Sequence, residues 1–282
     1  PTITGTAEAD SAIRMTVNGV VYTATTDSNG AWSATVTNTL PDNTYTVSAT
    51  ATDAALNVSA PGTGSLLVDA TPPDAPTIDD LITNDTTPTL TGTAEAGSTV
   101  TITVGTDVYT TTATGDGSWT KTATNALAEG DYDILATATD VLGNESAQAT
   151  GSLEIDITAP ADPVVTYVSA TELVGTATAD IYVQVYRSNG TTQVANTYAD
   201  SSGDYTISFN PIRTHNETLY VSTFDVAGNE SNKVEVQVDA QAPQPPVIVN
   251  QSTNNTRPTI TGTAEADSAI RMTVNGVVYT AT

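Results

Sequence analysis

The strongest constraint on the fold of this 282-residue chain is internal repetition. Residues 1–25 recur without a single change at residues 258–282, and a shorter period divides the sequence between them. The segment Val68–Pro72 is echoed by Ile155–Pro160 and by Val238–Pro243, so three stretches of nearly equal length follow one another. Because a repeated stretch of this size folds as a repeated unit, the sequence predicts a tandem array of small domains of one kind.

Each period consists of short segments that favour β-strands. Thr, Val, Ile and Tyr alternate in runs that Gly, Asn, Asp and Pro separate, and helical periodicity is nearly absent. In Thr99–Val104 the alternation places Val and Ile on one face and Thr on the other, as in a sheet with one solvated face. In the second period we expect strands near residues 77–82, 88–94, 99–104, 108–113, 118–124, 131–139 and 147–155. Seven strands in such a period predict an antiparallel β-sandwich.

These observations divide the chain into four parts. We expect a first domain at residues 1–69 that lacks its first strand, and complete domains at residues 70–156 and 157–239. Residues 240–282 would form the N-terminal part of a fourth domain, which repeats the first. The expected fold class is therefore all-β, with tandem antiparallel β-sandwich domains in a linear, extended array.

The chain is strongly acidic. It has 32 Asp and Glu against 7 Lys and Arg, a formal net charge of -25, while 38% of its residues are hydrophobic. That hydrophobic content is enough for folded cores, so the carboxylates decorate folded domains. Such a charge repels phosphate backbones and anionic membranes, and no apolar run is long enough for a membrane helix. We therefore expect no nucleic-acid partner and no membrane insertion in this segment.

An acidic turn that contains glycine and precedes an aromatic residue occurs in every period. Asp27–Trp32, Gly115–Trp119 and Asp200–Tyr205 each lie between two predicted strands. We interpret each as a hairpin turn followed by a core aromatic residue. A calcium loop is the alternative, but the two or three side-chain oxygens of such a turn cannot fill a shell of six to eight ligands.

Two further motifs place acidic and amide side chains at one end of each domain. Asp140–Ser146, with counterparts at Asp225–Ser231 and more loosely at Asp53–Ser59, joins the sixth and seventh strands. A Gly-Thr-Ala-Glu motif joins the second and third strands at residues 5–8, 92–95 and 262–265. Because consecutive antiparallel strands reverse direction, both loops are expected where strand one begins, next to the linker from the preceding domain.

We therefore expect calcium at the junctions, held by a linker and by the two loops beside it. The candidate ligands at the first junction are Asp69, Asp74, Glu95, Asp140 and Asn144. Those at the second are Asp156, Asp162, Asp180, Asp225 and Asn229. Thr178 stands there at the position of the motif's glutamate, and Asp180, two positions later, is the expected substitute ligand. At the third junction they are Asp239 and Glu265, and the first domain carries the counterparts Glu8, Asp53 and Asn57.

Each of these residues also suits an ordinary turn. The pattern Asp-x-x-Gly-Asn favours a loop with a left-handed glycine, and Asp-x-Thr-x-Pro favours an extended linker. Clustered carboxylates repel one another unless a cation lies between them, which favours the metal interpretation. Magnesium prefers a small octahedral shell, and a chain with no Cys and one His lacks the usual zinc ligands, so calcium is the expected ion.

The linker, the Gly-Thr-Ala-Glu turn, the acidic turn and the Asp-x-x-Gly-Asn-x-Ser loop, in this order, resemble the bacterial Ig-like repeats of giant type I secreted, RTX-type, biofilm-associated adhesins. The resemblance covers essentially the whole chain, with departures at Leu56, Gln241 and Thr178. It implies immunoglobulin-like domains that serve as extenders of an extracellular stalk on the bacterial cell surface. Calcium between neighbouring repeats of the same chain would stiffen the stalk, and the adhesive target would be bound elsewhere in the full protein.

Other functions find less support. His215 is the only histidine and no nucleophile motif lies beside it, so we expect no catalysis. A carbohydrate- or protein-binding module would carry an insertion or an exposed aromatic cluster in one period, and none of the three does. A third possibility is a head-to-tail filament, in which residues 240–257 of one molecule supply the first strand that domain one of the next molecule lacks. A long array of identical repeats explains the same ends more simply.

Overall fold

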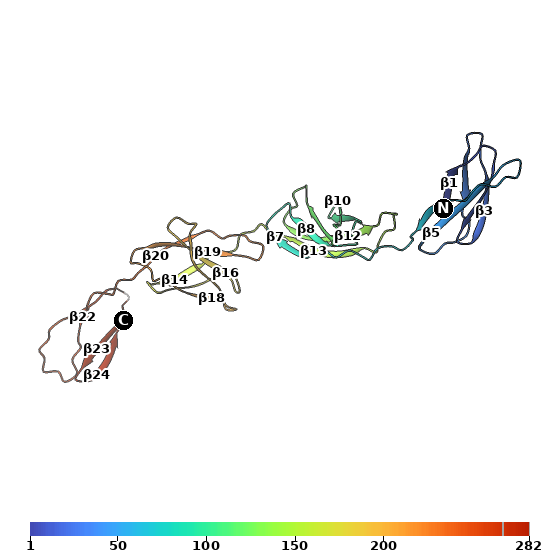
Figure 1. Cartoon of the computed structure of the whole chain (residues 1–282). Helices are drawn as coiled ribbons and strands as arrows, with labels where there is room; N and C mark the ends of the chain where they lie inside the picture. The colour runs from blue at the N-terminus through green and yellow to red at the C-terminus, as the bar shows by residue number, and fades with distance from the viewer. Residues whose placement is uncertain (267, 282) are drawn as a thin grey trace. The chain divides into compact units, whose positions relative to one another are not determined.

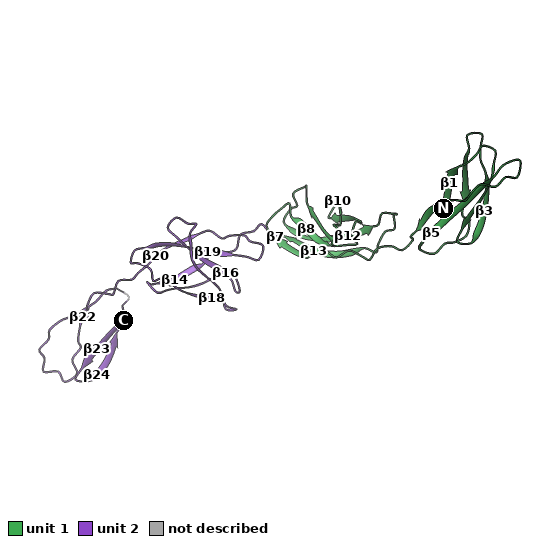
Figure 2. Ribbon diagram, in the orientation of Figure 1, with its two compact units in different colours: residues 1–155 green, residues 156–282 purple. Residues whose placement is uncertain are grey.

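The computed structural model describes residues 1–266 and 268–281, which form strands, turns and loops without a helical residue. The chain forms two compact units, Pro1–Ile155 and Asp156–Thr282 (Figure 2). Within the described residues, no helix is long and apolar enough to cross a membrane. The all-β expectation is therefore confirmed.

Unit 1 contains two groups of sheets (Figure 1). The first group has the strands β1 (Thr2–Thr6), β2 (Ala12–Val17), β3 (Val20–Thr25), β4 (Ala31–Thr35), β5 (Asn43–Thr52) and β6 (Gly62–Val68). Its sheets have the orders β3-β2-β5-β6 and β1-β4. The second group has β7 (Leu81–Thr83), β8 (Thr89–Thr93), β9 (Thr99–Val104), β10 (Asp107–Thr112), β11 (Ser118–Thr122), β12 (Gly130–Thr139) and β13 (Ala149–Ile155). Its sheets have the orders β10-β9-β12-β13-β7 and β11-β8.

Unit 2 repeats this arrangement once and begins it again. The first part has β14 (Val164–Val168), β15 (Glu172–Thr176), β16 (Tyr182–Arg187), β17 (Gln193–Tyr198), β18 (Asp204–Ser208), β19 (Thr218–Phe224) and β20 (Val234–Gln237). Its sheets have the orders β14-β15-β18 and β17-β16-β19-β20. The second part has β21 (Val247–Ile248), β22 (Gly262–Thr263), β23 (Ile270–Val274) and β24 (Val277–Ala281), which pair as β21-β22 and β23-β24.

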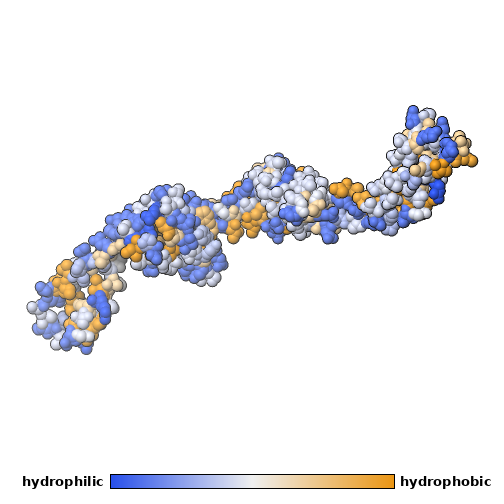
Figure 3. Space-filling view, viewed as in Figure 1, coloured by the Kyte–Doolittle hydropathy of each residue, from blue (hydrophilic) through white to orange (hydrophobic). Residues whose placement is uncertain are grey.

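Alternation along each strand builds the cores. Val100, Ile102 and Val104 of β9 are buried, while Thr99 is exposed and Thr101 and Thr103 are half-buried, as the sequence pattern predicts. Leu90 and Trp119 from the smaller sheet pack against these residues, so the core lies between two facing sheets. Burial of one such Val, Leu or Ile side chain stabilises the fold by about 1.5–3 kcal/mol. On the face that Figure 3 shows, hydrophilic and near-neutral residues cover most of both units.

The first strand of the second period differs from the expected single run over residues 77–82. The backbone N–H groups of Thr77 and Asp79 donate to the carbonyls of Thr93 (2.8 Å) and Thr91 (3.0 Å), so residues 77–79 lie against β8. After Asp80, β7 pairs in parallel with β13 in the other sheet. The chain thus changes sheets at Asp80, whose Oδ1 accepts the N–H of Ser152 at 2.8 Å. Residue alternation cannot reveal such a change of partner.

The interpretation of the acidic turns as hairpins is wrong. The Asp27–Trp32 turn connects β3 to β4, yet β3 pairs with β2 and β4 pairs with β1 in a different sheet. The same holds for β10 and β11 and for β17 and β18. Each turn therefore carries the chain from one sheet to the other. Gly30 adopts a φ of 81° there, which allows a tight turn. The residues of a tight turn are of the same types whether or not the two flanking strands pair with each other, so the sequence could not distinguish the two cases.

Two of the three aromatic residues that follow these turns are core residues, as expected. Trp119 and Tyr205 are each 2% exposed, and burial raises the pKa of Tyr205 to about 12. Trp32 is only half-buried, although it packs against the Met15 and Val17 core. The prediction of a core position for Trp32 is thus only partly correct.

Candidate metal centres at the linkers

The loop between β12 and β13 is shaped by its own polar groups. Oδ1 of Asp140 accepts hydrogen bonds from the backbone N–H groups of Leu142 (2.8 Å) and Asn144 (2.9 Å). Gly143 takes the left-handed conformation, with a φ of 92°, that the turn requires. Asn144 Nδ2 donates to Asp140 Oδ2 at 2.7 Å. The Asn144 amide, followed by the loop N–H groups, lowers the pKa of Asp140, because these donors stabilise its ionised form.

The side chain of Asn144 also reaches the linker. Its Nδ2 donates to the backbone carbonyl of Asp69 at 3.1 Å. The Asp69 carboxylate turns back on the linker and accepts the N–H of Thr71 at 3.1 Å. The structure therefore places the loop between the sixth and seventh strands beside the start of the linker. We refer to this asparagine contact as the loop-linker bond.

Unit 2 contains the same arrangement. Asn229 Nδ2 donates to Asp225 Oδ2 at 2.9 Å and to the backbone carbonyl of Asp156 at 2.8 Å. The N–H of Asn229 donates to Asp225 Oδ1 at 2.8 Å, and the N–H of Thr158 donates to Asp156 Oδ1 at 2.9 Å. Asn229 is 9% exposed, so this loop-linker bond is largely shielded from water. The repetition shows that the arrangement belongs to the repeat itself.

The loop forms by itself in residues 1–69. Asn57 Nδ2 donates to Asp53 Oδ2 at 2.8 Å, and Asp53 Oδ1 accepts the N–H groups of Ala55 (2.9 Å) and Asn57 (2.8 Å). Leu56 takes the left-handed position with a φ of 68°, where the other two loops have glycine. The hydrogen bonds from Asn57 lower the pKa of Asp53, as in the Asp140 loop. The first period therefore contains the same hydrogen-bonded loop as the two that follow it.

The other expected ligands lie in several settings. The Asp162 carboxylate holds Asn232, whose N–H donates to Oδ1 at 2.9 Å. Asp180 lies in a turn with a φ of 59°. The backbone carbonyl of Glu8 accepts a hydrogen bond from Thr26 Oγ1 at 2.7 Å, and that of Glu95 accepts one from Ser98 Oγ at 2.7 Å. Glu95 and Asp74 are exposed.

Asp239 and Glu265 line one recess of about 340 Å³ together with His215. His215 Nδ1 lies 3.5 Å from Asp239 Oδ1 and 3.3 Å from the backbone nitrogen of Ala240. A neutral Nδ1 can accept the N–H of Ala240, whereas an ion pair with Asp239 needs a protonated ring, so the two contacts belong to different protonation states. The only histidine of the chain therefore contacts the linker.

The carboxylates beside the first two linkers have amide donors as neighbours. In the described part of the chain, the recorded ion pairs lie between residues 187 and 239, and none involves Asp69, Asp140, Asp156 or Asp225. No group of three or more His, Cys, Asp or Glu side chains that could hold a metal ion occurs among the described residues. The structure thus brings Asp140 and Asn144 together with the backbone of Asp69, and Asp225 and Asn229 with that of Asp156.

Sequence reasoning missed Asp42. This residue precedes β5, and its Oδ1 accepts the N–H of Ala70 at 2.9 Å while Oδ2 accepts the hydroxyl of Thr71. The Thr71 hydroxyl and the Ala70 N–H lower the pKa of Asp42. Asp42 thus holds the linker where it leaves residues 1–69. One signal was available, because Glu129 precedes β12 at the corresponding position of the next period.

Solved structures with a similar chain course include adhesins. One is a Ca2+-stabilized adhesin that helps an Antarctic bacterium reach out and bind ice, with 22% identity, coverage of 99% of this chain and 82% of that chain, and a TM-score of 0.33. Another is a tetra-tandem repeat in the extending region of a large adhesion protein, with 23% identity, the same coverages and a TM-score of 0.30. The FN1–FN3 domains of chicken CNTN1 show 12% identity, coverages of 82% and 89%, and a TM-score of 0.38.

Comparison with curated proteins finds no match. Family models give the assignment. The model described as bacterial Ig domain matches residues 159–240, and the model described as bacterial Ig-like domain matches residues 1–70 and 73–157, which together are more than half of the chain. The chain belongs to the bacterial Ig-like domain family.

Proposed function

We propose that this chain is a structural extender, a stalk segment of a large bacterial cell-surface adhesin, and that calcium stiffens its junctions. The observation that supports this best is the repeated loop-linker bond. Asn144 and Asn229 each connect a loop of a domain to the first residue of the linker that leads into that domain. A contact that recurs with the repeat fits a role in which every domain holds its linker in the same way.

The linkers themselves favour an extender. Pro73, Pro76 and Pro163 are buried, so the first two linkers pack onto protein at these prolines, whereas the prolines of the third linker are exposed. Proline also fixes φ near -65° and removes an N–H group, which keeps the backbone extended. Short packed linkers transmit orientation from one domain to the next more readily than flexible Gly-Ser linkers do.

Calcium fits the donor chemistry beside the loop-linker bond. The hydrogen bonds of Asn144 connect Asp69 with Asp140, and each of these two residues has a carboxylate. Each carboxylate keeps free lone pairs after it accepts the N–H bonds described above. All the proposed metal-ligating atoms are oxygens, which calcium prefers as ligands. Water molecules complete the coordination shell of many bound calcium ions. We propose Asp69, Asp74, Glu95, Asp140 and Asn144 as ligands at the first junction, with the exposed Asp74 and Glu95 turning toward the ion.

The same proposal extends to the other junctions. The second site would use Asp156, Asp162, Asp180, Asp225 and Asn229, and the third would use Asp239 and Glu265. Glu8, Asp53 and Asn57 would serve in the same way wherever a linker precedes residues 1–69. Bound calcium would cancel the repulsion between carboxylates and so hold one orientation.

The extender role includes no catalysis. His215 lies against Ala240 and Asp239 at the linker. We place the segment outside the bacterial cell, exported by type I secretion as in the RTX-type adhesins that its motifs resemble. Adhesion and biofilm formation would depend on target-binding modules elsewhere in the full protein.

Calorimetric titration with calcium tests the proposed site. The Asp140→Ala variant should lose the first site, with binding there at least about tenfold weaker, because one charged ligand is gone. Asp116→Ala is the control, since it removes an exposed carboxylate from the turn before β11 that we do not propose as a calcium ligand. The control should bind calcium like the parent chain. Equal losses in the two variants would contradict the assignment of the ligands.

A further inference from the structure

The third period carries a row of aromatic rings on the outer face of the sheet β17-β16-β19-β20. Tyr182 pairs with Tyr198 on one side and with Phe224 on the other. The ring centroids of Tyr182 lie 5.1 Å from those of Tyr198 and 6.2 Å from those of Phe224, and each pair is tilted by 57°. Tyr198 is 68% exposed, and the other two rings are half-buried. Val183, the next residue of β16, is buried in the core, so the row lies on the opposite face.

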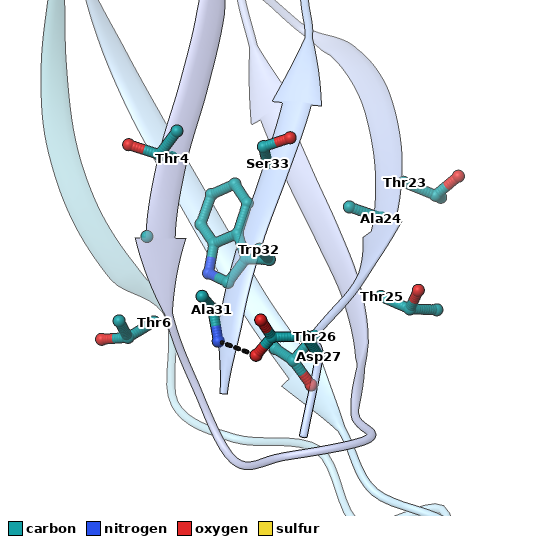
Figure 4. A pocket seen from close by; sticks show the side chains of 11 residues that line it. Thr4, Thr6, Thr23, Ala24, Thr25, Thr26, Asp27, Ala31, Trp32 and Ser33 are labelled. Atoms are coloured by element: carbon teal, nitrogen blue, oxygen red, sulfur yellow. Dashed lines mark hydrogen bonds between the residues drawn. The ribbon is translucent and has the colours of Figure 1, made fainter. Parts of the chain in front are cut away.

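The first and second periods have small side chains at the same positions. In the second period the pairing register places threonines there, namely Thr99, Thr112 and Thr139. In the first period it places Thr25 opposite Ala12, and Figure 4 shows Thr25 on the side of β3 that faces away from Trp32. The expectation that no period carries an exposed aromatic cluster is therefore wrong for the third period. Its rings come from three separate strands, and only the fold brings them together.

Two amide side chains lie beside the rings. Gln184 and Asn196 pair with each other, each two residues along its strand from a tyrosine of the row, so both lie on the same face. Asn196 is exposed and Gln184 is half-buried. Within the described part of the chain, no hydrogen bond is recorded for either side-chain amide, and each has two N–H donors and a carbonyl acceptor to offer a ligand. We call these five residues the aromatic-amide surface: Tyr182, Tyr198, Phe224, Gln184 and Asn196.

A network of paired polar groups borders this surface. Glu230 Oε1 accepts the hydroxyl of Ser222 at 2.7 Å and that of Tyr186 at 3.1 Å. Lys233 Nζ lies 3.2 Å from the same oxygen and 4.5 Å from the centroid of the Tyr186 ring. Ser222, which pairs with Gln184, is fully buried. The Glu230 carboxylate beside the aromatic-amide surface is therefore already neutralised by a lysine.

Charge and size narrow the class of ligand. The five side chains carry no charge and the carboxylate beside them is paired, which favours an uncharged ligand over a cation. The formal net charge of -25 repels anionic ligands. A specific protein interface buries about 800 Å² on each partner, whereas this surface is five side chains on three strands, roughly 10 Å across. A small neutral ligand is therefore the best match.

We propose that the aromatic-amide surface binds a neutral glycan built from hexose rings. Such a ring has an apolar face of C–H groups and an edge of hydroxyl groups. The C–H face packs on an exposed aromatic ring, while the amides of Gln184 and Asn196 exchange hydrogen bonds with the hydroxyl groups and fix the orientation of the sugar. None of the five residues is a proposed calcium ligand, so this proposal stands or falls independently of the extender proposal.

Calorimetric titration of the whole chain with two neutral glucans, maltoheptaose and cellohexaose, tests the proposal. At least one of them should bind. Tyr198→Ala should weaken that binding about tenfold or more, because it removes the most exposed ring of the row. Asn196→Ala should weaken it as well, because hydrogen bonds to the sugar hydroxyl groups are lost. Both side chains are exposed, so both variants should keep the circular dichroism spectrum of the parent chain.

Two controls make the result specific. Tyr167→Ala removes a 52% exposed tyrosine of the same period from β14, which belongs to the other sheet, and it should bind the glucan like the parent chain. Hyaluronan oligosaccharides carry carboxylates and should be repelled by the acidic chain. The proposal would be overturned if neither glucan bound, if Tyr198→Ala and Tyr167→Ala lost binding equally, or if hyaluronan bound as tightly as the glucan.

Discussion

The side-chain amide of Asn144 makes two hydrogen bonds with one nitrogen, to the Asp140 carboxylate and to the backbone of Asp69. A lysine could bridge the same two groups, but it would neutralise the carboxylate that we propose as a calcium ligand. A neutral amide fixes the loop and leaves the negative charge in place. In a chain with a net charge of -25, a neutral side chain at this position leaves the negative charge of the Asp140 carboxylate uncompensated.

The loop-linker bond should contribute measurably to stability. Asn144→Ala removes the bond to Asp69 as well as the bond within the loop, so we expect a loss of about 1–2 kcal/mol of unfolding free energy. Asn57→Ala is the matched control, because Asn57 makes the bond within the loop to Asp53. Urea denaturation followed by circular dichroism would compare them. A larger loss for Asn57→Ala would show that the linker contact has no stabilising role.

The carboxyl group of Asp116, in the turn before β11, should have an unusually low pKa. The Thr114 hydroxyl, followed by the Ser118 hydroxyl and N–H, lowers the pKa of Asp116 from 3.8 to about 2. Because the folded pKa is lower than the unfolded one, the stabilisation is complete above about pH 4 and is lost as the pH falls toward 2. Carboxyl NMR should show this pKa, and Thr114→Val should return it toward 3.8. An unchanged pKa in that variant would exclude the hydroxyl as the main cause.

At the level of elements, alternation predicted six of the seven strands of the second period to within two residues of their observed ends. It failed where a segment changes partner. Residues 77–83 lie against β8 and then against β13, and the acidic turns cross between sheets. Side-chain periodicity reports which face is buried, and it is silent about which neighbour supplies the hydrogen bonds.

The candidate sites show the same limit. The pairing of Asp140 with Asn144 follows from their spacing in one loop, so sequence could indicate it. The acceptor of the loop-linker bond is a backbone carbonyl. Every residue has a backbone carbonyl, so the residue type at this position does not indicate the bond. Asp42 meets Thr71 across a long separation in sequence, and only the fold brings them together.

The close approach of the first strand to Gly92 predicts a strong substitution effect. Gly92→Ala places a methyl group 2.1 Å from the carbonyl oxygen of Thr77 and against Trp119, so we expect a loss of about 3 kcal/mol or more. Gly62→Ala is the control, since its Cβ would lie 3.9 Å from the carbonyl of Ala49, and it should change stability by less than about 0.5 kcal/mol. Denaturant midpoints would measure both. Similar midpoints for the two variants would mean that the first strand is loosely held.

For the molecule as a whole, repetition and charge act together. The family models match three successive stretches of the chain, and the loop-linker bond occurs at the linkers that start at Asp69 and Asp156. The boundaries 1–69, 70–156, 157–239 and 240–282 stay predictions. Each core is separate, so removal of calcium should loosen the linkers while the sandwiches keep their buried side chains.

The most direct test of a calcium-stiffened extender is small-angle scattering of the chain with calcium and with a chelator, together with circular dichroism. A domain of this fold is about 35–40 Å long, so three domains with fixed junctions should span on the order of 110–130 Å. We predict that the chelator lowers the maximum dimension while the β-sheet signal largely persists. The same maximum dimension with and without calcium, at low and at physiological salt, would contradict the stiffening role.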